Sequence, residues 1–214
     1  MTTTVIFDLD GTLVDTEAIY LQSNVRAAAE LGLKRTEDDF RPLVGSAGPN
    51  EAKIIADLVG SENAAWFQEF STKDVLDRIR NGADFVLPGA DEALRTLQAA
   101  RYRLALATSS AQHYVDVVLA AAGWQDWFDP ILTGSDVEAH KPDPEVYQVM
   151  KRHLGAGPAI VIEDTHVGVA AAEGAGLPVV MIPGIAQQPD EKATAILSSI
   201  TELPDWLQKH GTFA

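Results

Sequence analysis

The sequence contains no cysteine. Disulfide bonds, zinc sites built from thiolates and thiol nucleophiles are therefore excluded from its chemistry. This absence fits a reducing compartment, and the N-terminal segment Met1–Thr4 lacks the basic residues that begin a secretory signal peptide. We therefore expect a cytoplasmic protein.

Basic residues are scarce: lysine and arginine together number 16, against 31 aspartates and glutamates, and the formal net charge is −15. Such a chain repels the phosphate backbone of nucleic acids, so we expect no nucleic-acid partner. Apolar runs are short, and none approaches the roughly 18 residues of a transmembrane helix, so we expect no membrane partner. An anionic ligand would need a local site built from a metal ion, a lysine and helix N-termini.

The 214 residues, of which 46% are hydrophobic, are enough for one sizeable core and a smaller second domain. Short apolar segments predict strands, and helical patterns separate the later ones. The predicted strands are Thr4–Phe7, Arg103–Ala107, Pro130–Thr133, Ala159–Ile162 and Pro178–Ile182, and the helices are Ala90–Ala100, Gln112–Ala122 and Pro144–Leu154. This alternation predicts an α/β fold with a mainly parallel sheet flanked by helices, which binds ligands at the carboxyl ends of its strands.

Three further features are expected toward the C-terminal end of the chain. Asp143 should cap the helix that begins at Pro144, and Gly155 should end it. The segment Gly184–Asp190 should be an exposed loop. A final helix is expected within Thr194–Gln208, with an interruption near Pro204.

The region from Thr16 to Phe85 breaks the alternation, because it contains helical patterns and no convincing strand. We expect helices at Glu17–Leu31, Pro49–Val59 and Ala64–Arg80. This block lies between the first predicted strand and the helix that follows Pro88. We interpret it as an all-helical insertion that covers the strand ends as a lid, with Trp66 and Phe67 in its core.

The most informative motif directly follows the first predicted strand, where Asp8 and Asp10 precede Gly11 and Thr12. Side chains alternate along an extended chain, so both aspartates point to the same side. Two acids held this close repel each other and need a cation or a shared proton at neutral pH. A solvated Asp-Gly turn is the alternative interpretation, and three later segments argue against it.

Each of the later segments places polar groups at a strand end or a helix start. Thr108, Ser109 and Ser110 lie between a strand and a helix N-terminus, where hydroxyl and N–H groups bind phosphate. Lys141 is followed by two nearby prolines, which restrict the turn that carries its ammonium group. Glu163 and Asp164 end a buried strand and offer the oxygen ligands that suit Mg²⁺.

Taken in this order, the four segments resemble the motifs of the haloacid dehalogenase superfamily of aspartate-nucleophile hydrolases. The resemblance covers nearly the whole chain, and the helical insertion is similar to that family's α-helical cap. It implies a Rossmann-like catalytic core at 1–15 and 86–214 and a mobile cap at 16–85.

The resemblance also implies roles for individual residues. Asp8 would be the nucleophile, Asp10 the general acid and then the general base, and Lys141 would pair with both Asp8 and the phosphate. Thr108 and the backbone N–H of Ser109 would hold phosphoryl oxygens. The implied ligands of a Mg²⁺ cofactor are Asp8, the carbonyl oxygen of Asp10, Asp164 and Glu163.

By the same resemblance, we expect a phosphatase that acts on a small phosphorylated metabolite such as a sugar phosphate. A sugar-phosphate mutase of the β-phosphoglucomutase type is the main alternative, although Tyr20 stands where those enzymes usually carry a histidine. A phosphoacceptor domain or a catalytically inactive binding protein is disfavoured, because the Asp pair is N-terminal and no motif residue is lost. Dehalogenation is disfavoured because Asp10 is present.

Residues of the insertion should set the substrate preference. The Gly/Pro-rich segment from Phe40 to Pro49 is similar to a cap loop that reaches the active site in the family. Arg41 and Gly45 are its candidate substrate-binding residues, although an exposed surface role is the alternative for Arg41. We expect a monomer or a weak homodimer.

Overall fold

The computed structural model describes residues 2–44, 48–184 and 188–211. Contacts between Cα atoms divide the chain into two compact units, of which one comprises Met1–Asp15 with Val86–Ala214 and the other Thr16–Phe85. We call these the core unit and the helical unit. The core unit is thus built from two segments that flank the helical unit in the sequence.

The chain leaves and re-enters the core unit at one place. Val14 and Val86 form an antiparallel β-bridge there, and the N–H of Leu87 donates to the carbonyl oxygen of Leu13 at 3.0 Å. Both ends of the excursion are therefore tied together, and residues 16–85 interrupt no strand of the sheet.

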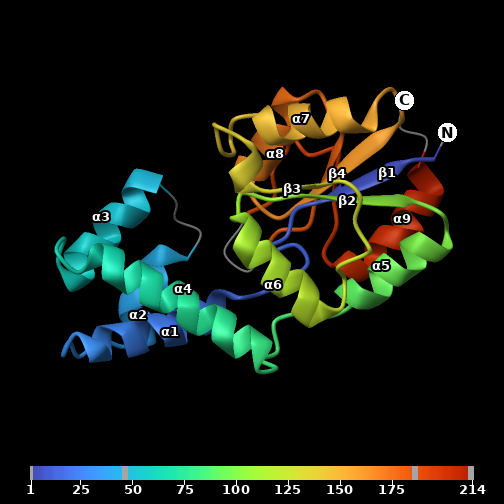
Figure 1. Cartoon of the computed structure of the whole chain (residues 1–214). Coiled ribbons are helices and arrows are strands. Elements are labelled where there is room, and N and C mark those ends of the chain that lie inside the picture. Colours follow the sequence, from blue (N-terminus) through green and yellow to red (C-terminus); the bar gives the residue numbers. More distant parts are fainter. Residues whose placement is uncertain (1, 45–47, 185–187, 212–214) are drawn as a thin grey trace. The chain divides into compact units, whose positions relative to one another are not determined.

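Six parallel strands form the sheet in the described part of the core unit, in the order β3-β2-β1-β4-β5-β6 (Figure 1). They are β1 (Thr4–Phe7), β2 (Arg103–Ala107), β3 (Ile131–Leu132), β4 (Ala159–Glu163), β5 (Val179–Met181) and β6 (Ala195–Ile196). Strands β2 and β3 extend the sheet on one side of β1, and strands β4, β5 and β6 extend it on the other side. The carboxyl ends of β1 and β4 therefore form the switch point at which such sheets bind ligands.

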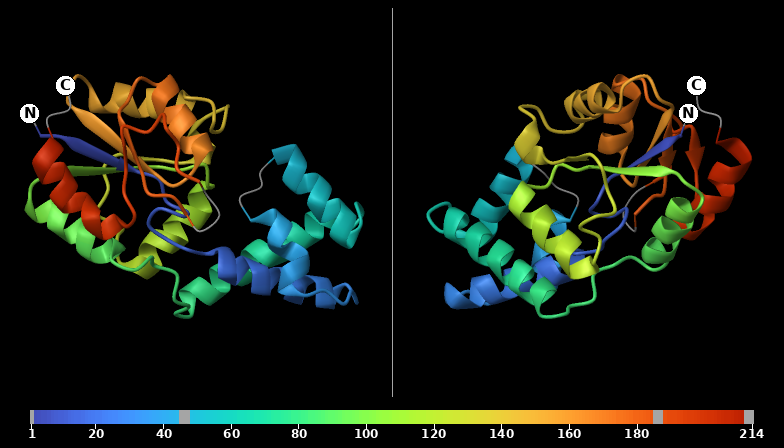
Figure 2. Two further views of the ribbon diagram at one scale, coloured as in Figure 1. Left: turned by 180° about the vertical axis from the view of Figure 1, so that it is seen from behind. Right: turned by 45° about the vertical axis from the view of Figure 1, so that its right-hand side comes forward.

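Helices cover both faces of this sheet (Figures 1 and 2). One face carries α5 (Ala90–Ala99), α6 (Gln112–Ala122) and α9 (Leu203–His210), and the other carries α7 (Glu145–Leu154) and α8 (His166–Gly174). Right-handed crossovers explain this division, because α5 and α6 connect strands in one direction and α7 and α8 in the other. The loops that precede α6, α7 and α8 consequently lie at the carboxyl edge of the sheet.

The core sits on both sides of β1 and β4, which are buried along their whole lengths. Near-continuous apolar sequence is expected for parallel strands that helices cover on both faces. Ile6 and Val161 belong to the cluster that packs against α7 and α8, together with Tyr147, Met150 and Val169.

The helical unit contains α1 (Glu17–Glu30), α2 (Glu37–Phe40), a 3-10 turn at Arg41–Leu43, α3 (Gly48–Val59) and α4 (Ala64–Arg80). Its core gathers small residues of α1 with larger side chains of the other helices. Phe40 and Phe67 stack at its centre, with their ring centroids 5.5 Å apart. The buried members are Ala27, Ala28, Phe40, Ile55, Val59 and Phe67.

The five predicted strands and the three helices that separate the later ones are all present, with small shifts at their ends. The expected start of the third helix was wrong by one residue: α7 begins at Glu145, with Pro144 at its N-cap position. Asp143 nevertheless accepts a hydrogen bond from the Glu145 N–H at 3.0 Å, and Gly155 ends the helix with a positive φ of 71°. The predicted loop at Gly184–Asp190 falls partly outside the described residues.

The final helix expected within Thr194–Gln208 is present but shorter: α9 begins only at Leu203, and Pro204 lies in its first turn rather than at an interruption. This segment contains β6, a 3-10 turn at Ile200–Glu202 and the start of α9. The N–H groups of Thr194 and Leu197 donate to carbonyl oxygens of β5 at 2.8 and 2.9 Å. Residues Ala195 and Ile196 therefore pair with the edge of β5, although the local sequence pattern there also suits a helix.

Trp66 was expected in the core of the helical unit, but its side chain is 41% exposed, whereas Phe67 is 1% exposed. Neighbouring positions on a helix point in directions about 100° apart, so only one of the two can face the core. Within the described residues, no helix is both long and apolar enough to cross a membrane.

Replacing Phe67 by alanine should lower the free energy of unfolding by about 3–5 kcal/mol, because it removes a buried ring and leaves a cavity. Urea denaturation followed by circular dichroism measures this. The matched change Trp66→Ala should cost about 1.5 kcal/mol or less, since it removes mainly a surface contact with Phe70. Equal losses for both variants would contradict the assigned core.

Candidate active site

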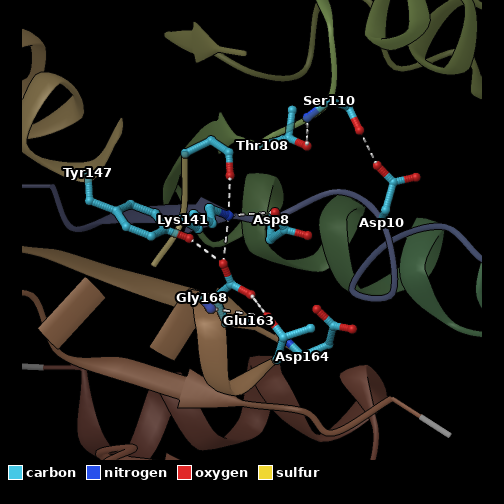
Figure 3. A network of polar contacts seen from close by, with 11 residues as sticks. Asp8, Asp10, Thr108, Ser110, Lys141, Tyr147, Glu163, Asp164 and Gly168 are labelled. Carbon is cyan, nitrogen blue, oxygen red and sulfur yellow. Dashed lines mark hydrogen bonds and ion pairs between the residues drawn. The ribbon is translucent and has the colours of Figure 1, made fainter. Parts of the chain in front are cut away.

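Asp8 and Lys141 meet at the carboxyl end of β1, although they are far apart in the sequence. The Lys141 ammonium donates to Asp8 Oδ1 at 2.6 Å and to the carbonyl oxygen of Ala107, at the end of β2, at 3.0 Å. The two side chains are only 6% and 10% exposed. Lys141 lies in the loop between β3 and α7, and its peptide bond to Pro142 is cis. This loop therefore places a buried ammonium group beside the first aspartate (Figure 3).

Glu163, the last residue of β4, holds Lys141 from the other side. Its Oε1 accepts from the Lys141 ammonium at 2.6 Å and from the Tyr147 hydroxyl at 2.7 Å, while its Oε2 accepts from the backbone N–H of Asp164 at 3.2 Å. Donors from three segments therefore contact this carboxylate and fix its position: the loop after β3, helix α7 and the residue that follows β4. Lys141 also lies over the Tyr147 ring, 4.9 Å from its centroid.

Two glycines leave room for these carboxylates. A Cβ atom at Gly11 would lie 2.1 Å from Asp164 Oδ2, and one at Gly168 would lie 1.9 Å from the Glu163 carboxyl carbon. Gly11 also has a φ of +86°, which side-chain-bearing residues rarely adopt. The first loop and the start of α8 are therefore shaped around the acidic residues.

Asp8, Glu163 and Asp164 form a buried cluster in which each offers a carboxylate oxygen within 4.8 Å of the others. Three carboxylates carry a charge of −3 and Lys141 carries +1, so the fully ionised set has a net charge of −2. One divalent cation would balance this charge, and oxygen-only donors are the ligands that Mg²⁺ and Ca²⁺ prefer. The donor set therefore fits a hard divalent metal ion.

The electrostatics of the metal-free cluster reflect the same imbalance. Burial raises the pKa of Asp164 to about 7, and the nearby Glu163 charge adds to the rise. Burial also raises the pKa of Asp8, which the Lys141 charge opposes and the other two carboxylates reinforce. Burial alone would lower the pKa of Lys141, but the charges of Asp8 and Glu163 outweigh it and raise that pKa, so the side chain is an ammonium at neutral pH.

The hydroxyl segment after β2 reaches the same edge of the sheet. Thr108 is buried and Ser109 is exposed. The Thr108 hydroxyl oxygen accepts from the Ser110 N–H at 3.1 Å, and this bond shapes the turn into α6. Thr108 therefore lies at the edge of the sheet that carries Asp8 and Lys141.

Asp10 lies apart from the acidic cluster and is only partly buried. Its Oδ2 accepts from the Ser110 hydroxyl at 2.7 Å, and its Oδ1 accepts from the Tyr114 hydroxyl at 2.6 Å. Figure 3 shows the Asp10 side chain turned toward Ser110, away from the network around Lys141. The two aspartates of the first motif thus have different surroundings.

The structure adds three polar partners that the sequence did not single out as site residues: Ser110, Tyr114 and Tyr147. Ser110 belonged to the segment that the sequence predicted as a phosphate site, but it was given no role of its own. Tyr114 and Tyr147 lie near the starts of α6 and α7, the helices that begin at the carboxyl edge. Their positions in the first turns of those helices could have indicated from the sequence that they lie near the site.

The two candidate residues of the insertion are in the helical unit. Arg41 is exposed and forms an ion pair with Asp38 at 2.6 Å, which agrees with the surface role that the sequence left open. Gly45 lies outside the described residues.

The helical unit also contains a cavity of about 270 Å³ among α1, α3 and α4. Ser71, which is 2% exposed, lines it, and among the described residues its hydroxyl has no hydrogen-bond partner. Burial of Glu51, which also lines the cavity, raises the pKa of its carboxyl group. The lining residues are Thr16, Glu17, Tyr20, Leu21, Asn24, Leu43, Val44, Glu51, Ile55, Phe67, Gln68, Ser71 and Thr72.

Residues 5–182 match the haloacid dehalogenase-like hydrolase family. The chain belongs to this family. This match covers every residue of the site described above, from Asp8 to Asp164, and includes the helical unit. The sheet order and the flanking helices are those of a Rossmann-like hydrolase of this family.

Individual relatives within the family are similar over most or all of the chain. An uncharacterized protein of Lacticaseibacillus casei, described by its position in an fgs 3′ region, is 79% identical over 215 residues and covers 100% of both chains. A phosphorylated carbohydrates phosphatase of Thermotoga maritima is 32% identical over 177 residues, or 81% of each chain. A crystal structure from Thermotoga maritima, provisionally assigned as a beta-phosphoglucomutase, has a TM-score of 0.81 at 28% identity and covers 98% of this chain and 99% of that one.

The raised pKa of Asp164 predicts a pH-dependent stability in the metal-free enzyme. Because this pKa of about 7 lies above the usual value of 3.8, the Asp164 carboxyl binds more protons in the folded state between these values, and its contribution to stability falls as the pH rises. Asp164→Asn removes this penalty and should stabilise the metal-free protein by up to about 4 kcal/mol near pH 8. Near pH 4 the effect should almost vanish.

Denaturant titrations in the presence of a chelator, repeated across this pH range, measure the effect. The exposed control Asp126→Asn should leave the pH dependence unchanged. An Asp164→Asn effect that is equal at both ends of the pH range would contradict the electrostatic account.

Proposed function

We propose that this hydrolase is a Mg²⁺-dependent phosphatase that cleaves a small phosphorylated metabolite through an aspartyl-phosphate. The observation that carries the proposal is the buried contact of Asp8 with Lys141 beside Glu163 and Asp164, at the switch point of the sheet. Phosphoryl transfer depends mainly on alignment and charge neutralisation, and this arrangement supplies both.

In the first step, an Asp8 carboxylate oxygen attacks phosphorus while the bond between phosphorus and the leaving oxygen breaks. The electron pair of that bond goes to the leaving oxygen, which takes a proton from Asp10. The products are an alcohol, a phosphorylated Asp8 and an ionised Asp10.

In the second step, water attacks the phosphorus and gives a proton to the Asp10 carboxylate. The bond between phosphorus and the Asp8 oxygen breaks, and its electron pair returns to Asp8 as inorganic phosphate leaves. Asp8 and Asp10 are thereby restored to their starting protonation states, and the cycle balances.

Lys141 neutralises charge during both steps. Its ammonium stays protonated because Asp8 and Glu163 stabilise it, and it is already within 2.6 Å of the attacking group. Glu163 and Tyr147 hold this ammonium at its place. Thr108 and the backbone N–H of Ser109 would bind phosphoryl oxygens just before α6.

We assign the Mg²⁺ ligands to Asp8, Asp164 and the carbonyl oxygen of Asp10, with Glu163 in a supporting position. Glu163 is the least available of the three acids, because donors already occupy both of its oxygens. A bound Mg²⁺ would neutralise the charge of the phosphoryl oxygens and lessen their repulsion of the nucleophile.

The cavity of the helical unit suggests the class of substrate. Among the described residues that line it there is no lysine or arginine, whereas Glu17, Glu51 and several neutral polar groups are present. Such a lining repels a second phosphate and suits hydroxyl groups. We therefore propose a sugar monophosphate or a similar polyol ester as the substrate, and we assign the hydroxyl-binding groups of this cavity a part in its recognition.

A sugar-phosphate mutase is the second candidate, favoured by the structural similarity to the protein assigned as a beta-phosphoglucomutase. A mutase of this type handles a bisphosphate, which the acidic lining of the cavity disfavours. Conversion of β-glucose 1-phosphate to glucose 6-phosphate, in the presence of a bisphosphate primer, would distinguish it from simple release of phosphate.

Asp8→Asn should lower phosphate release from 4-nitrophenyl phosphate by at least about 10³-fold, because an amide is a poor nucleophile. A colorimetric assay with and without Mg²⁺ measures this, and a denaturation curve verifies folding. Asp126→Asn, the same change at an exposed position, should retain full activity. Substantial activity of folded Asp8→Asn would overturn the nucleophile assignment.

Ser71→Ala should change stability and substrate binding in opposite directions. Removal of an unpartnered buried hydroxyl should raise the free energy of unfolding by about 1 kcal/mol. Loss of a hydrogen bond to the substrate should raise KM about three- to tenfold. The measurements are denaturant titrations and steady-state kinetics on the sugar phosphate that is hydrolysed fastest in a phosphate-release panel.

Ser23→Ala is the matched control in the same unit, because the Ser23 hydroxyl is satisfied by Asp74 at 2.8 Å. It should lose stability and leave KM unchanged. An unchanged KM for Ser71→Ala would remove the cavity from the substrate site without affecting the assignment of Asp8.

A further inference from the structure

Asp10 is held by two hydroxyl groups from the start of α6. Ser110 donates to one carboxylate oxygen at 2.7 Å, and Tyr114 donates to the other at 2.6 Å. Each oxygen thus has a separate donor, which restricts both torsions of the side chain. By contrast, Asp8 is held through its contact with Lys141.

The two donors are themselves fixed. The carbonyl oxygen of Ser110 accepts a hydrogen bond from the Gly134 N–H at 2.9 Å. The N–H of Ser110 donates to the hydroxyl oxygen of Thr108. Gly134 approaches so closely that a Cβ atom there would lie 2.3 Å from the carbonyl oxygen of Ser109. Tyr114 is 5% exposed, so its buried ring fixes the place of its hydroxyl.

The backbone that carries Asp10 is also held. Asp10 forms a β-bridge with Val14, and the N–H of the following Gly11 donates to the Val14 carbonyl oxygen at 2.8 Å. With the backbone and both carboxylate oxygens restrained, the orientation of Asp10 is set by the loop and by α6 together.

We propose that Tyr114, assisted by Ser110, is a positioning residue that holds the Asp10 carboxylate in the orientation needed for proton transfer. The inference rests on the proposed phosphatase activity and adds to it a determinant of the acid–base steps. An angular or positional error of the acid is costly, because a displacement of about 1 Å can lower a rate on the order of 10²-fold.

The hydroxyl of Tyr114 is the part of the residue that this role requires. The buried ring packs equally well as phenylalanine, so Tyr114→Phe removes one donor and retains the packing. A purely structural hydroxyl would affect all substrates alike. A hydroxyl that orients the acid would affect a substrate according to how much protonation its leaving group needs.

Phenyl phosphate and 4-nitrophenyl phosphate provide the test, because they differ only in the nitro group, and phenolate is the more basic leaving group. We expect Tyr114→Phe to lower kcat/KM for phenyl phosphate about tenfold, and that for 4-nitrophenyl phosphate about twofold or less. Where breakdown of the aspartyl-phosphate limits turnover, kcat should fall for both esters, because Asp10 must then accept a proton from water.

Ser110→Ala should give the same selective pattern, and it keeps the proposal testable if Tyr114→Phe does not fold. Tyr102→Phe is the matched control, because Tyr102 precedes β2 and has no place in the site; it should change neither constant. Equal losses of kcat/KM for the two esters, or no loss with phenyl phosphate, would overturn the proposal. If the wild type hydrolyses neither ester, the proposed function itself fails, which is a different result.

Discussion

A single buried ammonium holds the site together. Lys141 neutralises part of the charge of three clustered carboxylates and connects the ends of β1, β2 and β4 through Asp8, Ala107 and Glu163. Removing one partner from such a buried set leaves uncompensated charge, which typically costs about 3–5 kcal/mol. The glycines at 11 and 168, and the Tyr147 hydroxyl, are arranged around the groups that Lys141 brings together.

Much of this site could be predicted because the sequence marks strand ends clearly. Asp8, Thr108 and Asp164 each follow an apolar segment that could only be a buried strand, and parallel strands bring their carboxyl ends to one edge. Ser110 and Tyr114 were missed as partners of Asp10, because contacts across about 100 residues leave no local pattern. β6 was missed because its pairing depends on the free edge of β5 rather than on its own sequence.

The first motif separates two tasks by surroundings rather than by residue type. Asp8 is buried beside a cation and other acids, whereas Asp10, two residues later, is partly exposed and held by neutral hydroxyl donors. An ion pair suits a group that must remain an anionic nucleophile. The second carboxylate is held instead by the hydroxyl groups of Ser110 and Tyr114, so the two aspartates of one motif are held in different ways.

The β-bridge between Val14 and Val86 has an evolutionary consequence. Because the excursion is closed at its base, its ends stay together whatever lies between them, and changes within it exert no tension on β1 or β2. Selection can therefore lengthen, shorten or exchange residues 16–85 while the phosphoryl-handling groups keep their geometry. A fold of this design lets new specificities arise by replacement of one contiguous block, while the carboxylates and the lysine at the end of β1 stay unchanged.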